Sequence, residues 1–500
     1  MVSGAQASVS LQDTRQYSQS DRELDHGVLG TADIVFMVMA AASPLSVVVG
    51  LMPIAFAFGN GGGVPGTYLF TIVAMMLFAV GYVRIIPFVQ NAGAFYAYIA
   101  ASIGQTSGLA AAYVAALSYF ALSCSTLTAL SFFGAQFIER SIGVKSHWAL
   151  WAFASLAAVS VLSYHRITVA AKVLGVALLA EVALALLLDG AIVQRAGLGA
   201  FQLSEFSLKS VFAPGLGIAA IYAFDSVLGL EGTAIYQEEA RQRDVTVPRA
   251  TYISVVMVGL FYVLTAWCLA SAVGQSRVSA VARSSLGTFV TDQTVIYLGK
   301  WAAGAVGLLM VTSCFAAALA LFNNSARYLY ALARDGVLPD SLSRIHHKHR
   351  SPHIAGFVLT LALATVILSA VVAGLDPLVN VTTALVGLGS VGLMALLAVT
   401  ALAIPIFFLK RQIVSFSTSI APAAGGVMIA VAVCMAFANY SAVTGVDSVF
   451  VNHLPYLLIF VASVGAVQAR WIRWRRPDLY VRIGASRVDD VVGGCEPVEA

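Results

Sequence analysis

Two carboxylates and a glycine stand close together in an apolar stretch that reads FDSVLGLE over residues 224–231. They are Asp225, Gly229 and Glu231, and the apolar residues around them are typical of a membrane-spanning helix. An unpaired carboxylate in hydrocarbon costs about 2.5–3.5 kcal/mol or more, and a glycine lets a helix open. Such groups are tolerated mainly around a cavity that binds something. The stretch therefore predicts a substrate site inside a membrane.

A second interruption is expected near Ser43 and Pro44, in the stretch AAASPLS over residues 40–46. Proline lacks a backbone N–H and clashes with the carbonyl four residues before it, so the helix should open around Ser43. An ordinary proline kink is the alternative interpretation. The two breaks lie about 185 residues apart, at the first segment of each of two five-helix halves. Paired interruptions of this kind indicate the central site of an inverted-repeat transporter.

The first break would expose backbone amides to a substrate carboxylate, because the start of a half-helix is its positive end. The residues assigned to this role are Ala42, Ser43, Leu45 and Ser46. Pro44 has no N–H, so Leu45 and Ser46 are better donors.

The second break would present backbone groups of Val227, Leu228 and Gly229 to the substrate. Asp225 lies just before this opening and could bind a cationic amine. Its alternative role is that of a helix-terminal carboxylate bonded to a neighbouring side chain. Substrate specificity depends on how the helices pack, and Tyr113, Tyr119 and Phe120 are possible walls of the pocket.

Glu231 and Glu181 are the candidates for proton coupling, since a carboxylate within the membrane can exchange a proton during transport. A structural tie between helices is the alternative for each. Sodium coupling would require hydroxyl groups near the first break. The only adjacent pair, Thr312-Ser313, lies early in the eighth apolar segment, which favours protons over sodium.

The elements that must position these residues are membrane helices. Hydrophobic residues make up 59% of the 500 residues and charged residues only 10%, which is unlike a soluble globular chain. Twelve apolar runs are long enough to span about 30 Å of hydrocarbon. They lie at about 31–57, 66–88, 107–138, 147–165, 168–189, 213–237, 250–274, 301–333, 354–374, 380–409, 421–441 and 454–474.

Loop charges predict the orientation of the chain. With both termini in the cytoplasm, 21 of the 28 lysine and arginine residues fall on the cytoplasmic side, as the positive-inside rule requires. The net charge of +4 is then a sign of topology and not of nucleic-acid binding. Residues 1–28 carry no signal peptide and should form a cytoplasmic tail, and we expect a second, disordered tail over 477–500. The expected location is the plasma membrane.

Other functional classes receive little support. No H-E-x-x-H or G-x-S-G pattern indicates a membrane-embedded enzyme, and neither terminus is long enough for the signalling domain of a substrate sensor. The five cysteines have no metal-like spacing, and the histidines of residues 346–350 should lie in a solvated basic loop. We therefore expect no metal and no cofactor.

Three motifs resemble the amino acid–polyamine–organocation permeases. Residues 224–250 contain GLE, EEARQRD and VPRATY, similar to that family's sixth-helix signature. Residues 325–339, SARYLYALARDGVLP, are similar to its motif at the end of helix eight, and residues 92–98 are a weaker match. The likeness covers about residues 29–440. Two departures are Ala42-Ser43-Pro44 in place of G-S-G and the absence of a proline after the acidic pair.

The resemblance implies an all-α membrane protein of the leucine-transporter type. Helices 1–5 (about 29–190) and 6–10 (about 211–410) would form the inverted repeat, with two peripheral helices over 411–476. It also implies a carrier of amino acids or related amines, driven by protons or by exchange. Glu231 falls on a glutamate linked to proton coupling in some relatives, and a lysine stands near the position of Glu181 in others.

Overall fold

The computed structural model describes residues 29–89, 95–165, 168–229, 233, 240–441 and 449–484. Within these ranges the regular structure is helical, apart from one isolated β-bridge between Leu29 and Ala240. Eleven helices in the described ranges are long and apolar enough to cross a membrane. A shorter apolar helix, α11, accounts for the sixth predicted segment. The prediction of an all-α membrane protein is confirmed.

The first half of the chain contains the first broken helix and four further long helices. Its elements are α2 (Thr31–Ala42), α3 (Pro44–Ser46), η1 (Val47–Leu51), α4 (Met52–Phe58), η2 (Gly61–Gly63), α5 (Val64–Ile85), α6 (Phe95–Ser102), α7 (Gln105–Ile142), α8 (Trp148–His165), α9 (Thr168–Ala196), η3 (Leu198–Ala200), η4 (Leu203–Phe206) and α10 (Leu208–Val211).

The second half begins at the second broken helix. Its elements are α11 (Leu216–Asp225), α13 (Arg243–Val273), α14 (Val278–Ser284), α15 (Phe289–Leu298), α16 (Lys300–Arg334), η6 (Asp340–Ser343), α17 (His353–Val372), η7 (Pro377–Thr382), α18 (Thr383–Lys410), η8 (Phe416–Ile420), α19 (Ala421–Ala438), α21 (Val449–Asn452), α22 (Leu454–Arg475) and α23 (Pro477–Arg482). The division into two inverted five-helix halves stays a prediction.

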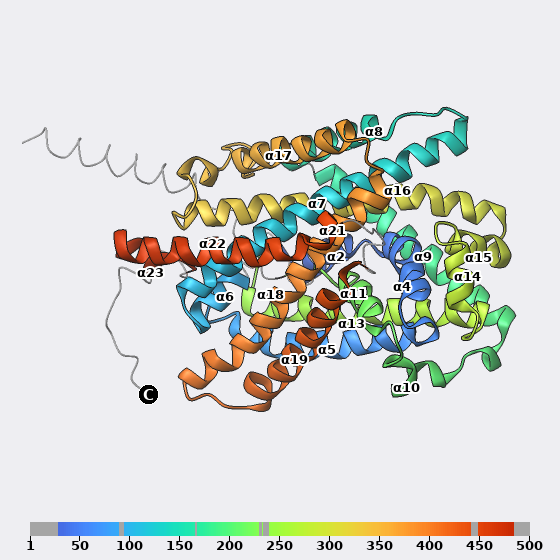
Figure 1. The fold of residues 1–500 in the computed structure, drawn as a ribbon, viewed down its shortest axis with the longest axis horizontal. Coiled ribbons are helices and arrows are strands. Elements are labelled where there is room, and N and C mark those ends of the chain that lie inside the picture. Colours follow the sequence, from blue (N-terminus) through green and yellow to red (C-terminus); the bar gives the residue numbers. More distant parts are fainter. Residues whose placement is uncertain are drawn as a thin grey trace, which may run out of the picture.

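The long helices run side by side across the molecule (Figure 1). The predicted third and eighth segments, α7 and α16, pack against each other in the middle, while α8 and α17 form one edge. On the other side, α19 packs on α5 and α18. The short helices α10, α14 and α15 gather at one end of the bundle (Figure 1). Most of the buried side chains belong to one continuous apolar cluster.

The first predicted break is confirmed. Helix α2 ends at Ala42, Ser43 adopts a left-handed conformation with φ of 48°, and Pro44 begins the next helical run. Proline is well placed there, because the first residue of a helix needs no N–H donor. A π-helical turn, η1, follows directly and leads into α4.

The second predicted break lies at the end of α11. The helix stops at Asp225, residues 226–229 form turns, and Gly229 has φ of 105°, where a side chain would be strained. Thr233 is helical again. The rest of this region, including Leu230 and Glu231, lies outside the described residues.

The two broken helices approach each other closely at one end. A Cβ added to Gly59, just after α4, would lie 2.8 Å from the Ala219 Cβ of α11. Gly215, which precedes α11, has φ of 92°, and a Cβ there would lie 2.5 Å from the Gly59 carbonyl oxygen. These two glycines allow α4 and α11 to pack backbone against backbone.

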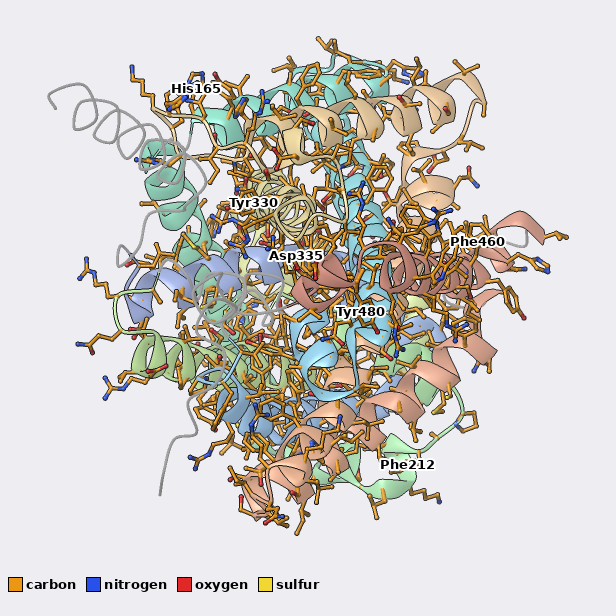
Figure 2. The ribbon with its side chains drawn as sticks, turned by 90° about the vertical axis from the view of Figure 1, so that its left-hand side faces the viewer. His165, Phe212, Tyr330, Asp335, Phe460 and Tyr480 are labelled. Atoms are coloured by element: carbon orange, nitrogen blue, oxygen red, sulfur yellow. The ribbon has the colours of Figure 1, made fainter. Side chains whose placement is uncertain are left out.

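The expected disordered C-terminal tail is wrong for residues 477–484. Helix α23 packs on α22, and the Tyr480 hydroxyl bonds to Thr106 at 2.9 Å. Asp335, at the end of α16, accepts hydrogen bonds from the Tyr96 hydroxyl (2.8 Å) and the Gly484 amide (3.0 Å). Asp335 and Tyr480 lie near each other in Figure 2. Tertiary contacts therefore order this segment despite its polar composition.

Candidate functional site

The gap between α2 and α3 is closed by serine hydroxyls. The Ser43 Oγ donates to the Ser313 carbonyl (3.0 Å) and lies 2.9 Å from the Ser313 Oγ. The Ser46 amide donates to the Ser313 Oγ at 3.4 Å, and the Ser43 and Ser46 hydroxyls are bonded to each other. Ser313 thus ties α16 to both sides of the break. The expectation that Thr312-Ser313 lies too early in its helix to reach this break is wrong.

Glu181, on α9, lies at the same break. Its side chain is 2% exposed, and its Oε1 atom accepts from the Thr312 hydroxyl at 3.5 Å. The Leu45 amide and the Ser313 hydroxyl lie close enough to the carboxyl group to favour its charged form. Its Oε2 atom has no partner among the described residues. A carboxylate of the protein therefore occupies the amide end of the helical run that starts at Pro44.

Asp225 is the last residue of α11 and faces α18. Its Oδ1 atom accepts a hydrogen bond from Ser390, which is fully buried on α18. The C-terminal end of a helix carries a partial negative charge, so a carboxylate placed there is unfavourable unless a cation compensates it. No ion pair to Asp225 occurs in the described part of the chain.

Tyr262, on α13, contacts the first break and lies within electrostatic range of the second. Its hydroxyl donates to the Ala42 carbonyl at 3.1 Å, at the end of α2. Its ring packs against Tyr68 of α5, with ring centroids 5.9 Å apart. The side chain is fully buried, within electrostatic range of both Glu181 and Asp225. Tyr262 therefore lies in the space that the two carboxylates flank.

The structure brings most of the predicted substrate residues to the two breaks. Ala42, Ser43, Leu45, Val227 and Leu228 are buried. Ser46 is half-buried and Gly229 ends the turn that follows α11. Their contact with a substrate stays a prediction.

Two of the suggested aromatic walls face other helices. Tyr119 packs against Tyr328 of α16, with ring centroids 5.0 Å apart. The Tyr113 hydroxyl donates to Gln468 of α22. The sequence missed Ser390 and Tyr262, since a single polar residue in an apolar run carries no pattern that marks its partner.

The histidine loop is more ordered than a solvated loop would be. His349 lies 4.8 Å from both His165 and His346, measured between ring centroids. Tyr164 packs against His346 at 5.1 Å, and His165 lies at the edge of the molecule in Figure 2. Partial burial and the neighbouring positive groups lower the pKa of His349. No set of three metal-ligating side chains with suitable geometry occurs among the described residues.

Comparison with known proteins decides the family. The model of a family described as "Amino acid permease" matches residues 29–487. This chain belongs to that family. It is 24% identical over 302 residues to the low-affinity putrescine importer PlaP of Escherichia coli strain K12. That alignment covers 58% of this chain and 64% of the relative, less than two thirds of its length.

A further permease resembles a shorter part of the chain. The branched-chain amino acid permease BcaP of Bacillus subtilis strain 168 is 24% identical over 142 residues. This alignment covers 28% of the chain and 29% of the relative. The two relatives thus carry different substrate names at the same level of identity.

Proposed function

We propose that this permease is a secondary carrier that moves an amino acid or a related amine across the membrane by alternating access. The observation that carries the proposal is a pair of helix breaks that each have a carboxylate beside them, Glu181 and Asp225, both within electrostatic range of the same buried tyrosine, Tyr262. Interrupted helices whose ends face one another are the means by which many carriers bind small charged substrates.

The polarity of the second break supports a substrate with an ammonium group. Asp225 adds a negative charge to the negative end of α11, and its described partner, Ser390, is uncharged. A substrate ammonium group would balance both the Asp225 carboxylate and the negative end of α11. The name of PlaP, a putrescine importer, agrees with an amine, while that of BcaP, a branched-chain amino acid permease, keeps amino acids among the candidates.

A substrate carboxylate would bind at the first break through the amides of Leu45 and Ser46. Both amides currently face polar groups of the protein: Glu181 lies beside the first and the Ser313 hydroxyl accepts from the second. An amino acid would therefore have to compete with Glu181 for this end of the helix. A simple amine would not, which favours the amine.

We propose that Glu181 couples transport to protons. Its carboxyl group is buried at the first break, has an unpartnered oxygen among the described residues, and faces hydroxyl groups and an amide. Protonation would weaken its hold on the Leu45 amide and so change the electrostatics of the break. Glu231 lies outside the described residues, and its role in coupling stays a prediction.

Sodium is the competing ion. The position of Thr312-Ser313 along the eighth apolar segment suggested that too few hydroxyl groups lie near the first break to bind sodium. The Ser43 and Ser313 hydroxyls do lie at the break, so this argument against sodium does not hold. The carboxylate of Glu181 would suit either ion. The orientation, with both termini in the cytoplasm of a plasma-membrane carrier, follows from the loop charges and belongs to the same proposal.

Uptake into proteoliposomes tests this function. Purified protein would be supplied with labelled putrescine, leucine or lysine, under an imposed pH gradient, a sodium gradient or neither. We expect putrescine to accumulate with an inward proton gradient, and to exchange without one. If none of these solutes accumulates or exchanges in correctly folded protein, the carrier proposal fails. Accumulation that follows sodium alone would overturn the assignment of protons.

A further inference from the structure

A third buried carboxylate, Asp189, lies on the same helix as Glu181. The two are eight residues apart on α9, about 12 Å along the helix axis. Asp189 lies toward the end of α9 that meets η3 and η4. Its side chain is 2% exposed within a membrane-spanning segment, and nothing in the sequence motifs singles it out.

The contacts of Asp189 leave half of the carboxyl group without a partner. Its Oδ2 atom accepts from the Thr265 hydroxyl of α13 at 2.8 Å. The Cys268 thiol, one turn further along α13, lies close to the carboxyl group. The Oδ1 atom has no partner among the described residues. A carboxylate with so few donors is costly to keep ionised in hydrocarbon.

The charged groups around α9 are directed elsewhere. Helix α9 packs on α2, α3, α13, α15 and α16. Among the titratable groups at this end of the bundle, the Arg195 guanidinium donates to the Ile296 carbonyl, Asp292 is exposed and accepts from Thr288, and Lys300 is exposed. Tyr262 on α13 faces Ala42, Tyr297 on α15 donates to the Ala272 carbonyl, and Asp33 on α2 caps its own helix. Cys268 is the titratable group that lies close to Asp189.

Two hydroxyl side chains of α13 lie near the two carboxylates of α9. Tyr262 and Thr265 are three residues apart, so they lie on neighbouring positions of one helix face. Tyr262 is within electrostatic range of Glu181, and Thr265 binds Asp189. A hydroxyl can accept one proton while it donates another. The face of α13 thus places two groups able to relay protons between Asp189 and Glu181.

We propose that Asp189 is a second proton-binding residue of the carrier, which takes up a proton near the η3–η4 end of α9 and releases it toward Glu181. In this step Asp189 changes from carboxylic acid to carboxylate while Glu181 changes from carboxylate to carboxylic acid. The total charge of the pair is unchanged, and no other reactant is needed. The inference rests on the proton coupling proposed above, but the protonation of Asp189 can be measured without transport.

Infrared difference spectroscopy of the purified protein tests the protonation directly. On raising the pH, the wild type should lose a carboxylic-acid C=O band that is absent from the Asp189→Asn variant. Asn keeps the size of the side chain and can still accept from Thr265. Asp292→Asn, an exposed carboxylate on α15, is the matched control and should leave that band in place. If wild type and Asp189→Asn give the same difference spectrum from pH 4 to 10, the proposal is overturned.

Transport gives the second readout. Asp189→Asn should slow uptake driven by a pH gradient by about 10-fold or more, and leave exchange without a gradient within about two-fold of wild type. Asp189→Glu should recover part of the gradient-driven rate, which a purely structural role would not require. Full gradient-driven uptake by Asp189→Asn would overturn the relay. If the Asp189 band titrates but the wild type ignores a pH gradient, the proposed coupling fails while proton binding by Asp189 stands.

Discussion

The two helix breaks of this permease place a carboxylate at opposite electrical ends. At the first, Glu181 lies beside the amide end of the run that starts at Pro44, where the helix dipole stabilises an anion. At the second, Asp225 is the last residue of α11, where the dipole opposes an anion. At the first break, a carboxylate of the protein already balances the positive end of the helix. At the second break, the negative end of α11 and the Asp225 carboxylate can be balanced only by an added cation. We therefore expect the two carboxylates to serve coupling and substrate binding, respectively.

The largest expected effect comes from Asp225→Asn. Removing one partner of a buried, hydrogen-bonded charge pair costs about 2–5 kcal/mol, so kcat/KM for putrescine uptake should fall at least about 30-fold. Ser390→Ala removes a single hydrogen bond to Asp225 and should lower it only about five-fold. Initial rates in proteoliposomes measure both. Unimpaired putrescine uptake by Asp225→Asn would show that no substrate cation binds at the second break.

The next effect concerns coupling at the first break. Glu181→Gln cannot release a proton, so putrescine accumulation under an inward pH gradient should fall about 10-fold, while exchange stays within about three-fold of wild type. Accumulation ratios and counterflow rates measure the two quantities. A variant that responds to the pH gradient like the wild type would place coupling elsewhere, with Glu231 as the next candidate.

A smaller effect should follow from the hydroxyl that bridges the first break. Ser313→Ala removes the partner of the Ser43 hydroxyl and of the Ser46 amide, at about 1–2 kcal/mol. We expect a lower melting temperature in detergent and a KM raised about five-fold or more. Thr312→Val is the matched control, since its contact with Glu181 is longer, at 3.5 Å. Equal effects of the two variants would contradict the bridging role of Ser313.

The smallest effect concerns a buried carboxylate outside both breaks. Glu205 lies in η4, packed against α5, and burial raises its pKa to about 7. Because the folded pKa exceeds the unfolded value, its contribution to stability is present below about pH 4.5 and is lost as pH rises through about 7. We expect relaxation of the structure around the charge to reduce the effect, so Glu205→Gln should be more stable than wild type at pH 8 by about 1 kcal/mol.

Melting temperatures of wild type and Glu205→Gln between pH 4 and 8 measure this difference. The two curves should converge at the acid end, where both side chains are neutral. A constant offset at every pH would mean that burial of Glu205 does not disfavour its charge. In that case burial alone would also be a poor guide to Glu181 and Asp225.

Local chemistry made the two breaks predictable. Pro44 cannot continue a helix that begins before it, and Gly229 is free to adopt the positive φ that ends the turn after α11. The apolar runs likewise predicted the membrane helices, because an α-helix needs about 20 apolar residues to cross hydrocarbon. These properties depend on a residue and its close neighbours along the chain.

The partners across the site depended on how the helices pack. Ser313 lies early in its apolar segment, which suggested that it is far from the first break. Helix α16 nevertheless passes the break at Ser313 and places its hydroxyl against Ser43. Ser390, Tyr262 and Asp189 also meet residues more than 70 positions away. Such contacts are set by the depth and rotation of one helix against another, which a hydrophobic run does not encode. The sequence alone therefore specified that two helices break and which residues flank the breaks. Packing of the helices alone decided which carboxylate lies at the positive end of one helix and which at the negative end of the other.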